Sequence, residues 1–178
     1  MRIQEHLKLS TAVSLVAMPF LKKDTWIPFI ASIGIDVDHY LWYAVTHRSL
    51  RLREAVRFFQ QADPPQTAVM KLFHQPLFLG LLLFLGIRFR SRFLLLVLAG
   101  LLFHVGLDIL HNTQMGTLKQ TLSEQAMYSC PECGCPEEKL QLHTVRVTNN
   151  LLERYHPKYF VVLCPACHER AHRHAPVR

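Results

Sequence analysis

Residues 93–110 form an apolar run, FLLLVLAGLLFHVGLDIL, in which His104 and Asp108 are the only ionisable side chains. An α-helix of this length would be about 27 Å long, close to the roughly 30 Å thickness of a bilayer's hydrocarbon core. An imidazole and a carboxylate are costly in such surroundings unless they meet a partner. Because they are four residues apart, both lie on one face of the helix. The run therefore predicts a membrane helix that carries a polar site.

Three further apolar segments precede this run, at residues 9–21, 26–45 and 72–87. Together the four segments predict a mainly α fold, a four-helix membrane bundle, for the first part of the chain. The alternative for the first segment is the hydrophobic core of a signal peptide. No cleavage site of small residues follows it, so we favour the bundle.

The charge of the chain favours a lipid partner. The sequence has 20 Lys and Arg residues against 13 Asp and Glu residues, a net charge of +7. Most of this excess lies in the apolar part, which favours an anionic membrane surface over nucleic acid. If all four helices cross the bilayer, basic residues are more numerous on the side that holds both termini. The positive-inside rule then predicts a multi-pass protein of the inner (cytoplasmic) membrane with both termini in the cytoplasm.

A set of ionisable residues lies in or beside the four predicted helices. Its members are His6, Asp36, Asp38, His39, His74, His104 and Asp108. In an up-and-down bundle, the beginnings of the first and third helices are level with the ends of the second and fourth, so these side chains converge at one depth. Imidazoles and carboxylates in this mixture suit one or two divalent ions such as Zn, Mn or Fe. The alternatives are polar pairs that hold helices together and a proton or ion path.

We assign roles within this set by chemistry. Six of the residues are expected to bind the metal, which would activate water. Asp38 is expected to serve as the catalytic base, or else as a ligand or a group that orients a ligating imidazole. Because the site would face the cytoplasmic headgroup layer, we expect a phosphate-containing or other ester substrate.

The same residues resemble, in order and spacing, the family of bacterial membrane-bound, metal-dependent hydrolases of the inner membrane. The elements that carry the resemblance are His6, Asp36-Val-Asp38-His39, His74 and His104-Val-Gly-Leu-Asp108. The resemblance covers about residues 3–112 and implies a membrane-embedded hydrolase domain, which we place at residues 1–116. Ile35 stands where the family has a proline, and His74 lies in FHQPLF instead of a Thr-His-Ser element.

The polar end of the chain contains two C-x2-C knuckles, CPEC at 130–133 and CPAC at 164–167. Their four thiolates are the number that a closed, tetrahedral structural zinc site requires, and we expect Zn²⁺ there. The predicted ligands are Cys130, Cys133, Cys164 and Cys167. In a reducing cytoplasm such cysteines bind metal more readily than they form disulfides. Cys135 is a fifth cysteine that we expect to be a bystander.

The residues around the knuckles resemble the HNH endonuclease family over about residues 128–174. This resemblance implies a small ββα-type zinc-binding module, placed at residues 127–178. The positions that match the family's metal ligands are His143, His168 and His172. Thr144 occupies the position of the general base and cannot take a proton at neutral pH. We therefore expect a degenerate, HNH-like zinc finger, with residual nuclease activity as the less favoured alternative.

Two classes of function follow from these features. The first is an enzyme, a membrane-bound metal-dependent hydrolase with a structural zinc finger tail. The second is a membrane-anchored, HNH-like zinc finger that binds or cleaves nucleic acid, with the helical bundle as its anchor. Metal content separates the two, because only the enzyme needs ions in the bundle in addition to the metal of the tail.

Overall fold

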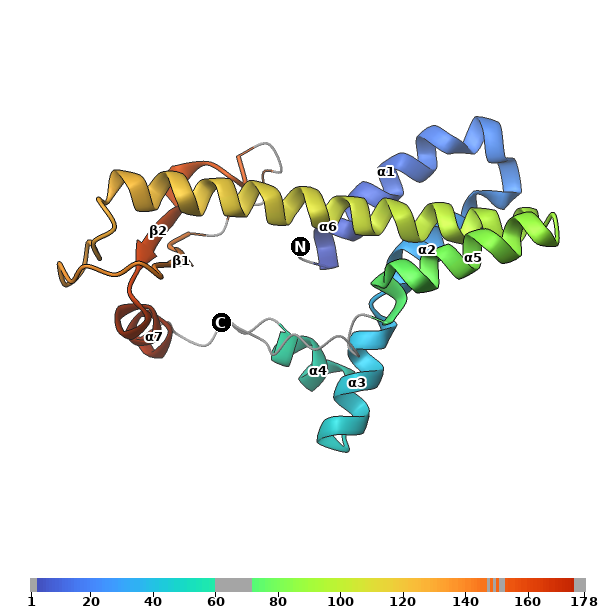
Figure 1. Ribbon diagram of the computed structural model, residues 1–178. Coiled ribbons are helices and arrows are strands. Elements are labelled where there is room, and N and C mark those ends of the chain that lie inside the picture. Colours follow the sequence, from blue (N-terminus) through green and yellow to red (C-terminus); the bar gives the residue numbers. More distant parts are fainter. Residues whose placement is uncertain (1–2, 60–71, 147, 149, 151–152, 175–178) are drawn as a thin grey trace. The chain divides into compact units, whose positions relative to one another are not determined.

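A computed structural model describes residues 3–59, 72–146, 148, 150 and 153–174 of the chain (Figure 1). The described elements are mainly helices, with one two-stranded sheet near the C-terminus, as the sequence predicts. The chain divides into two compact units, Met1–Ile109 and Leu110–Arg178. These are called the N-terminal unit and the C-terminal unit below, and each is described by itself.

The first two predicted helices differ in outline from the structure. Helix α1 spans Ile3–Leu21 and is followed by the short 3-10 helix η1, Lys22–Thr25. The segment predicted as one helix at 26–45 is divided into α2 (Trp26–Gly34) and α3 (Val37–His47). Gly34, a poor helix former, ends α2. The break places carboxylates at the start of α3, where unpaired backbone N–H groups and the helix dipole favour negative charge.

Helix α4 (Leu52–Phe59) was not predicted, because its arginines suggested a loop. Its apolar side chains face α3: the Phe58 and Phe59 rings lie 5.4 and 6.4 Å from the ring of Tyr43. Ala55 of the same helix is buried. The segment therefore forms a helix despite its arginines, because its apolar face packs against α3. The polar stretch at 60–66, which follows α4, lies outside the described residues.

The last two helices of the predicted bundle differ in length. Helix α5 (Pro76–Arg88) begins with a proline in its first turn and has 13 residues, so it is about 20 Å long. Helix α6 (Arg92–Gln125) has 34 residues and is about 51 Å long, which is far beyond the predicted end at residue 110. Leu118 and Leu122 lie one turn apart on the part of α6 that belongs to the C-terminal unit. Leu118 is buried, and Leu122 packs against the core of that unit.

These lengths do not support four separate membrane spans. Among the described helices, α6 is long and apolar enough to cross a membrane, judged by length and composition. Division of the 26–45 segment leaves helices of 9 and 11 residues, which are too short to span, and α5 is also short. The expected multi-pass topology is therefore not supported, because a break at Gly34 and a late start at Pro76 shorten two of the four helices.

Helices α1, α2 and α6 pack closely in the N-terminal unit. A Cβ atom added at Gly100 of α6 would lie 2.2 Å from the carbonyl oxygen of Pro28 in α2, so only glycine permits this contact. The outer faces of the helices are apolar: Phe20 is 81% exposed, Val16 is 72% exposed and Leu77 is 87% exposed. So many exposed apolar side chains are typical of a surface that contacts lipid or another protein.

The C-terminal unit is a small ββα arrangement. Strands β1 (Gln141–Thr144) and β2 (Phe160–Leu163) pair antiparallel, and helix α7 (Pro165–His174) follows. A short 3-10 helix, η3 (Pro157–Tyr159), leads into β2. The buried core consists of Cys130, Leu140, Val162, Leu163, Cys164 and Cys167. Half of this core is cysteine, so its packing depends on what the thiols bind.

Candidate metal centres

His104 is the most buried of the predicted ligands in the N-terminal unit, with 1% of its side chain exposed. Its Nδ1–H donates to the backbone oxygen of Ser32 in α2 at 2.7 Å. Its Nε2 lies 3.3 Å from Asp108 Oδ2 and 3.6 Å from Asp36 Oδ1. This Nε2 has no hydrogen-bond partner among the described residues. The ring is therefore fixed by one nitrogen, and the other nitrogen faces two carboxylates.

Asp108, one turn further along α6, faces a second imidazole. Its Oδ1 lies 3.1 Å from Nε2 of His6 in α1, a residue that is almost fully buried. The rings of His6 and His104 are stacked, with centroids 3.9 Å apart and planes 6° apart. The two oxygens of Asp108 therefore face the Nε2 atoms of two stacked imidazoles.

His74, which precedes α5, completes this arrangement. Its Nε2 lies 3.8 Å from Asp36 Oδ1 and 3.9 Å from Asp108 Oδ2. His104 thus belongs to two groups whose possible ligand atoms lie within 4.8 Å of one another, one with His6 and Asp108 and one with Asp36 and His74. Together the two groups form a set of five residues from four separate segments of the chain. We call this set the five-residue centre; its members are His6, Asp36, His74, His104 and Asp108.

Asp38 and His39 lie directly beside the five-residue centre. Asp38 is buried, and its Oδ1 accepts from both the backbone N–H of His39 at 2.7 Å and the ring Nδ1 of His39 at 2.6 Å. Its Oδ2 accepts from the backbone N–H of Phe73 at 3.1 Å and lies 3.6 Å from Nδ1 of His74. Asp38 therefore orients the imidazole of His39 and lies beside that of His74.

All seven residues predicted from the N-terminal part are brought together. The set also includes a contact that the sequence did not indicate, the backbone oxygen of Ser32. A backbone carbonyl has no sequence signature, so only the packing of α2 against α6 reveals it. His47 and His111 lie outside the set: His47 stacks on Tyr43, and His111 Nδ1 lies 2.9 Å from the Tyr155 hydroxyl within the C-terminal unit.

The four knuckle cysteines of the C-terminal unit form one cluster. All are free thiols, and their sulfur atoms lie within 4.8 Å of one another. The first knuckle is closed by the N–H of Gly134, which donates to the Cys130 oxygen at 2.7 Å and has a φ of +71° that favours glycine. The second begins α7, where the N–H of His168 donates to the Cys164 oxygen at 2.9 Å. This cluster could hold a metal such as zinc.

The thiols of this cluster differ in acidity. Burial raises the pKa of Cys130, but backbone hydrogen bonds from Cys164 and Cys133 outweigh burial and lower that pKa to about 6. Burial and then the neighbouring sulfurs raise the pKa of Cys167 to about 12. Ionisation of one thiol thus opposes ionisation of the next, and a bound cation would relieve this repulsion. Cys135, expected to be a bystander, lies next to the cluster: its Sγ is 3.2 Å from Cys133 Sγ.

A second cluster in the same unit contains only imidazoles. His143 of β1 lies opposite His168 and His172 of α7, with ring centroids 5.3 and 4.9 Å away. Nε2 of His172 is 3.3 Å from Nε2 of His168. Burial, then the charges of His172 and His168, lower the pKa of His143, whose buried Nδ1 lacks a hydrogen-bond partner among the described residues. Imidazoles grouped in this way are suited to bind a metal.

Comparisons with protein-family models, with curated proteins and with solved structures found no match to this chain. The chemistry of the two units is therefore inferred from their own residues.

Proposed function

We propose that this chain is a membrane-associated, metal-dependent hydrolase whose metal is held by the five-residue centre. The observation that carries the proposal is the buried Nε2 atom of His104. Its Nδ1–H is already donated to Ser32, so in a neutral ring Nε2 is an acceptor. An acceptor that faces two carboxylate groups at 3.3 and 3.6 Å requires a cation between them. Either a proton or a metal ion would supply it.

A metal ion satisfies the whole centre, whereas a single proton satisfies one nitrogen. His6 and His104 are stacked and both present Nε2 to Asp108, so protonation of both would bring two positive rings within 3.9 Å. Three imidazoles and two carboxylates are a common ligand set for Zn, Mn and Fe. The Nδ1 contacts support metal binding further, because ligating histidines usually donate their second N–H to a carbonyl or carboxylate. Ser32 supplies such a group for His104, and Asp38 lies beside that of His74.

The residues beside the centre suit proton transfer. When bound, a divalent ion supplies a Lewis acid that polarises an ester or phosphoryl oxygen and makes water more acidic. Asp38 holds the Nδ1–H of His39, so that Nε2 of His39 is the nitrogen available to accept a proton from attacking water. His39 is partly exposed, whereas Asp38 is buried and already accepts several hydrogen bonds. We therefore assign the base to His39 and a positioning role to Asp38.

We further propose that the chain lies in the cytoplasmic membrane, with the Cys/His unit in the cytoplasm. The apolar exterior of the N-terminal unit and the length of α6 support the first part. Free thiols in a metal-binding arrangement support the second, because such sites persist in a reducing compartment. The resemblance to membrane-bound, metal-dependent hydrolases agrees with this placement and with an ester or phosphoester substrate.

The test is metal-dependent hydrolysis by the purified full chain in lipid nanodiscs. Chromogenic phosphomonoesters, phosphodiesters and carboxylic esters are offered with Zn, Mn or Fe after chelation of the bound metals. We expect turnover of one class to return with metal and to fall at least 100-fold in His74→Asn. The matched control is His47→Asn, which changes a histidine outside the centre and should retain parental turnover. The hydrolase proposal fails if no class is turned over, or if His74→Asn hydrolyses as well as the parent.

A second candidate function is favoured by the imidazole cluster of the C-terminal unit. His143, His168 and His172 lie on the strand and helix where the HNH-like pattern places metal ligands. Exposed Thr144 follows His143 and cannot act as a base, so nucleic acid binding is better supported than cleavage. The test is whether the full chain binds supercoiled DNA. Loss of DNA binding in His143→Asn, together with loss of one metal ion per chain, would support this function.

A further inference from the structure

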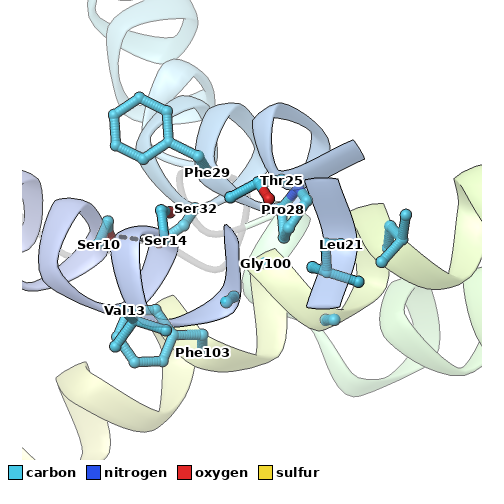
Figure 2. A pocket seen from close by; sticks show the side chains of 13 residues that line it. Ser10, Val13, Ser14, Leu21, Thr25, Pro28, Phe29, Ser32, Gly100 and Phe103 are labelled. Atoms are coloured by element: carbon cyan, nitrogen blue, oxygen red, sulfur yellow. Dashed lines mark hydrogen bonds between the residues drawn. The ribbon is translucent and has the colours of Figure 1, made fainter. Parts of the chain in front are cut away.

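A pocket of about 190 Å³ lies among α1, η1, α2 and α6 of the N-terminal unit (Figure 2). Its walls are largely apolar. The apolar side chains that line it include Val13, Ala17, Leu21, Phe29, Leu96 and Phe103. The pocket is only partly enclosed, so a molecule can enter it from the surface of the unit.

The polar groups of the pocket are largely satisfied within the protein. The hydroxyls of Ser10 and Ser32 form a hydrogen bond with each other at 2.9 Å, which Figure 2 shows as a dashed line. The Thr25 hydroxyl donates to the Lys22 backbone oxygen at 2.8 Å. Water is held stably only where several polar partners remain for it. An apolar occupant is therefore better suited to this pocket than water or a sugar.

Two residues of the pocket wall also adjoin the five-residue centre. Ser32 lines the pocket, and its backbone oxygen is the group that accepts from Nδ1 of His104. Phe103, another lining residue, directly precedes His104 in α6. A hydrocarbon chain in the pocket would thus lie beside Ser32 and Phe103, next to the buried imidazole of His104.

We propose that this pocket holds the hydrocarbon chain of a membrane lipid whose phosphate or acyl ester lies at the five-residue centre. This proposal rests on the proposed function and specifies its substrate class. The outer surface of α1 supports a membrane lipid as the occupant, because the apolar side chains of Leu15 and Phe20 on this helix are 61% and 81% exposed. A cavity of about 150 Å³ accommodates benzene, so this pocket has room for on the order of six to eight carbon atoms.

The test uses the full chain in lipid nanodiscs and an octyl phosphate that carries a diazirine at the end of its alkyl chain. After irradiation, mass spectrometry locates the labelled residues. We expect the label on pocket residues, among them Val13 and Phe103. Butyl, hexyl and octyl phosphates should compete with an affinity that rises about fourfold for each added methylene, and longer chains should gain little more. Inorganic phosphate should not displace the label from chelated protein.

Variants of the pocket wall make the test specific. Ala17→Phe fills the pocket and should reduce the label at least tenfold. Val16→Phe adds the same ring one residue away, at a side chain that is 72% exposed and outside the pocket, and should leave the label within twofold of the parent. Ala99→Leu narrows the pocket from α6 and serves as a second variant if Ala17→Phe does not fold.

The outcomes separate this proposal from the hydrolase itself. Label spread over the exposed apolar surface, equal in all variants, shows partition into lipid and overturns the pocket assignment. Pocket labelling that persists in a chain without a bundle metal leaves the pocket assignment standing while the hydrolase proposal fails. Label confined to the pocket, lost in Ala17→Phe and kept in Val16→Phe, supports the assignment.

Discussion

Replacement of His104 with asparagine separates the two contacts of its ring. The amide nitrogen of asparagine can take the place of Nδ1 and donate to the Ser32 oxygen, whereas nothing replaces Nε2. Loss of an outer-shell contact typically costs about 10–100-fold in metal affinity, and loss of a direct ligand should cost more. We therefore expect His104→Asn to lose the metal of the five-residue centre and to retain the zinc of the tail.

The same position also tests the hydrogen bond to Ser32. In His104→Ala the Ser32 oxygen remains buried without a donor, at a cost of about 1–3 kcal/mol, and a cavity adds to the loss. Measured without metal, His104→Ala should therefore unfold more easily than His104→Asn. Elemental analysis gives metal per chain, and denaturant titration in detergent gives the free energy of unfolding.

The control for this series is His111→Asn, which makes the same change on the same helix. His111 contacts Tyr155 and lies outside the five-residue centre, so its variant should keep the parental metal content. Parental metal content in His104→Asn would falsify the metal assignment. The contacts of His104 with Asp36 and Asp108 would then be an ion pair of a protonated histidine that holds helices together.

Further changes test the zinc cluster, the helix packing and the proton transfer. Cys167→Ser should release the tail zinc and melt the C-terminal unit, as followed by zinc release to a chromogenic chelator, whereas Cys135→Ser should retain the metal. Gly100→Ala should lower the free energy of unfolding by about 1–3 kcal/mol, because its Cβ would meet the Pro28 backbone. Gly106→Ala, whose Cβ would have nothing within 4 Å, should raise the free energy of unfolding by up to about 1 kcal/mol. Thermal unfolding measures both changes. Asp38→Asn should lower kcat more than KM and shift the pH profile of hydrolysis, because the tautomer of His39 is no longer fixed; an unchanged profile would contradict this role.

Much of the candidate chemistry was accessible from the sequence. His104 and Asp108 stand out because an apolar run has no other ionisable residue, and the spacing of four residues places them on one face. The C-x2-C knuckles are similarly informative, because four thiols at this spacing suit a single tetrahedral ion. In both cases the sequence signal is local and the cost of isolated polar groups is high, so the residues themselves indicate that partners exist.

Helix boundaries were less accessible. The break between α2 and α3 follows a glycine in an otherwise continuous apolar segment, and hydropathy alone treats that segment as one helix. Helix α4 was missed because its arginines masked an apolar face that packs on α3. A single glycine thus outweighed the hydropathy of its segment in the first case, and packing against α3 outweighed local composition in the second.

The sequence by itself determined which residues are candidate metal ligands: histidines and carboxylates within apolar helices, and cysteines in two knuckles. Only the tertiary structure decided how the seven N-terminal residues divide between the five-residue centre and the supporting Asp38–His39 pair. Only the tertiary structure showed that the backbone of Ser32 orients His104 beside an apolar pocket. The physical reason is that these contacts join segments as much as 102 residues apart in the chain, as in the pair of His6 and Asp108. Local spacing sets the face of a helix on which a side chain lies, but the packing of helix against helix sets which atoms meet.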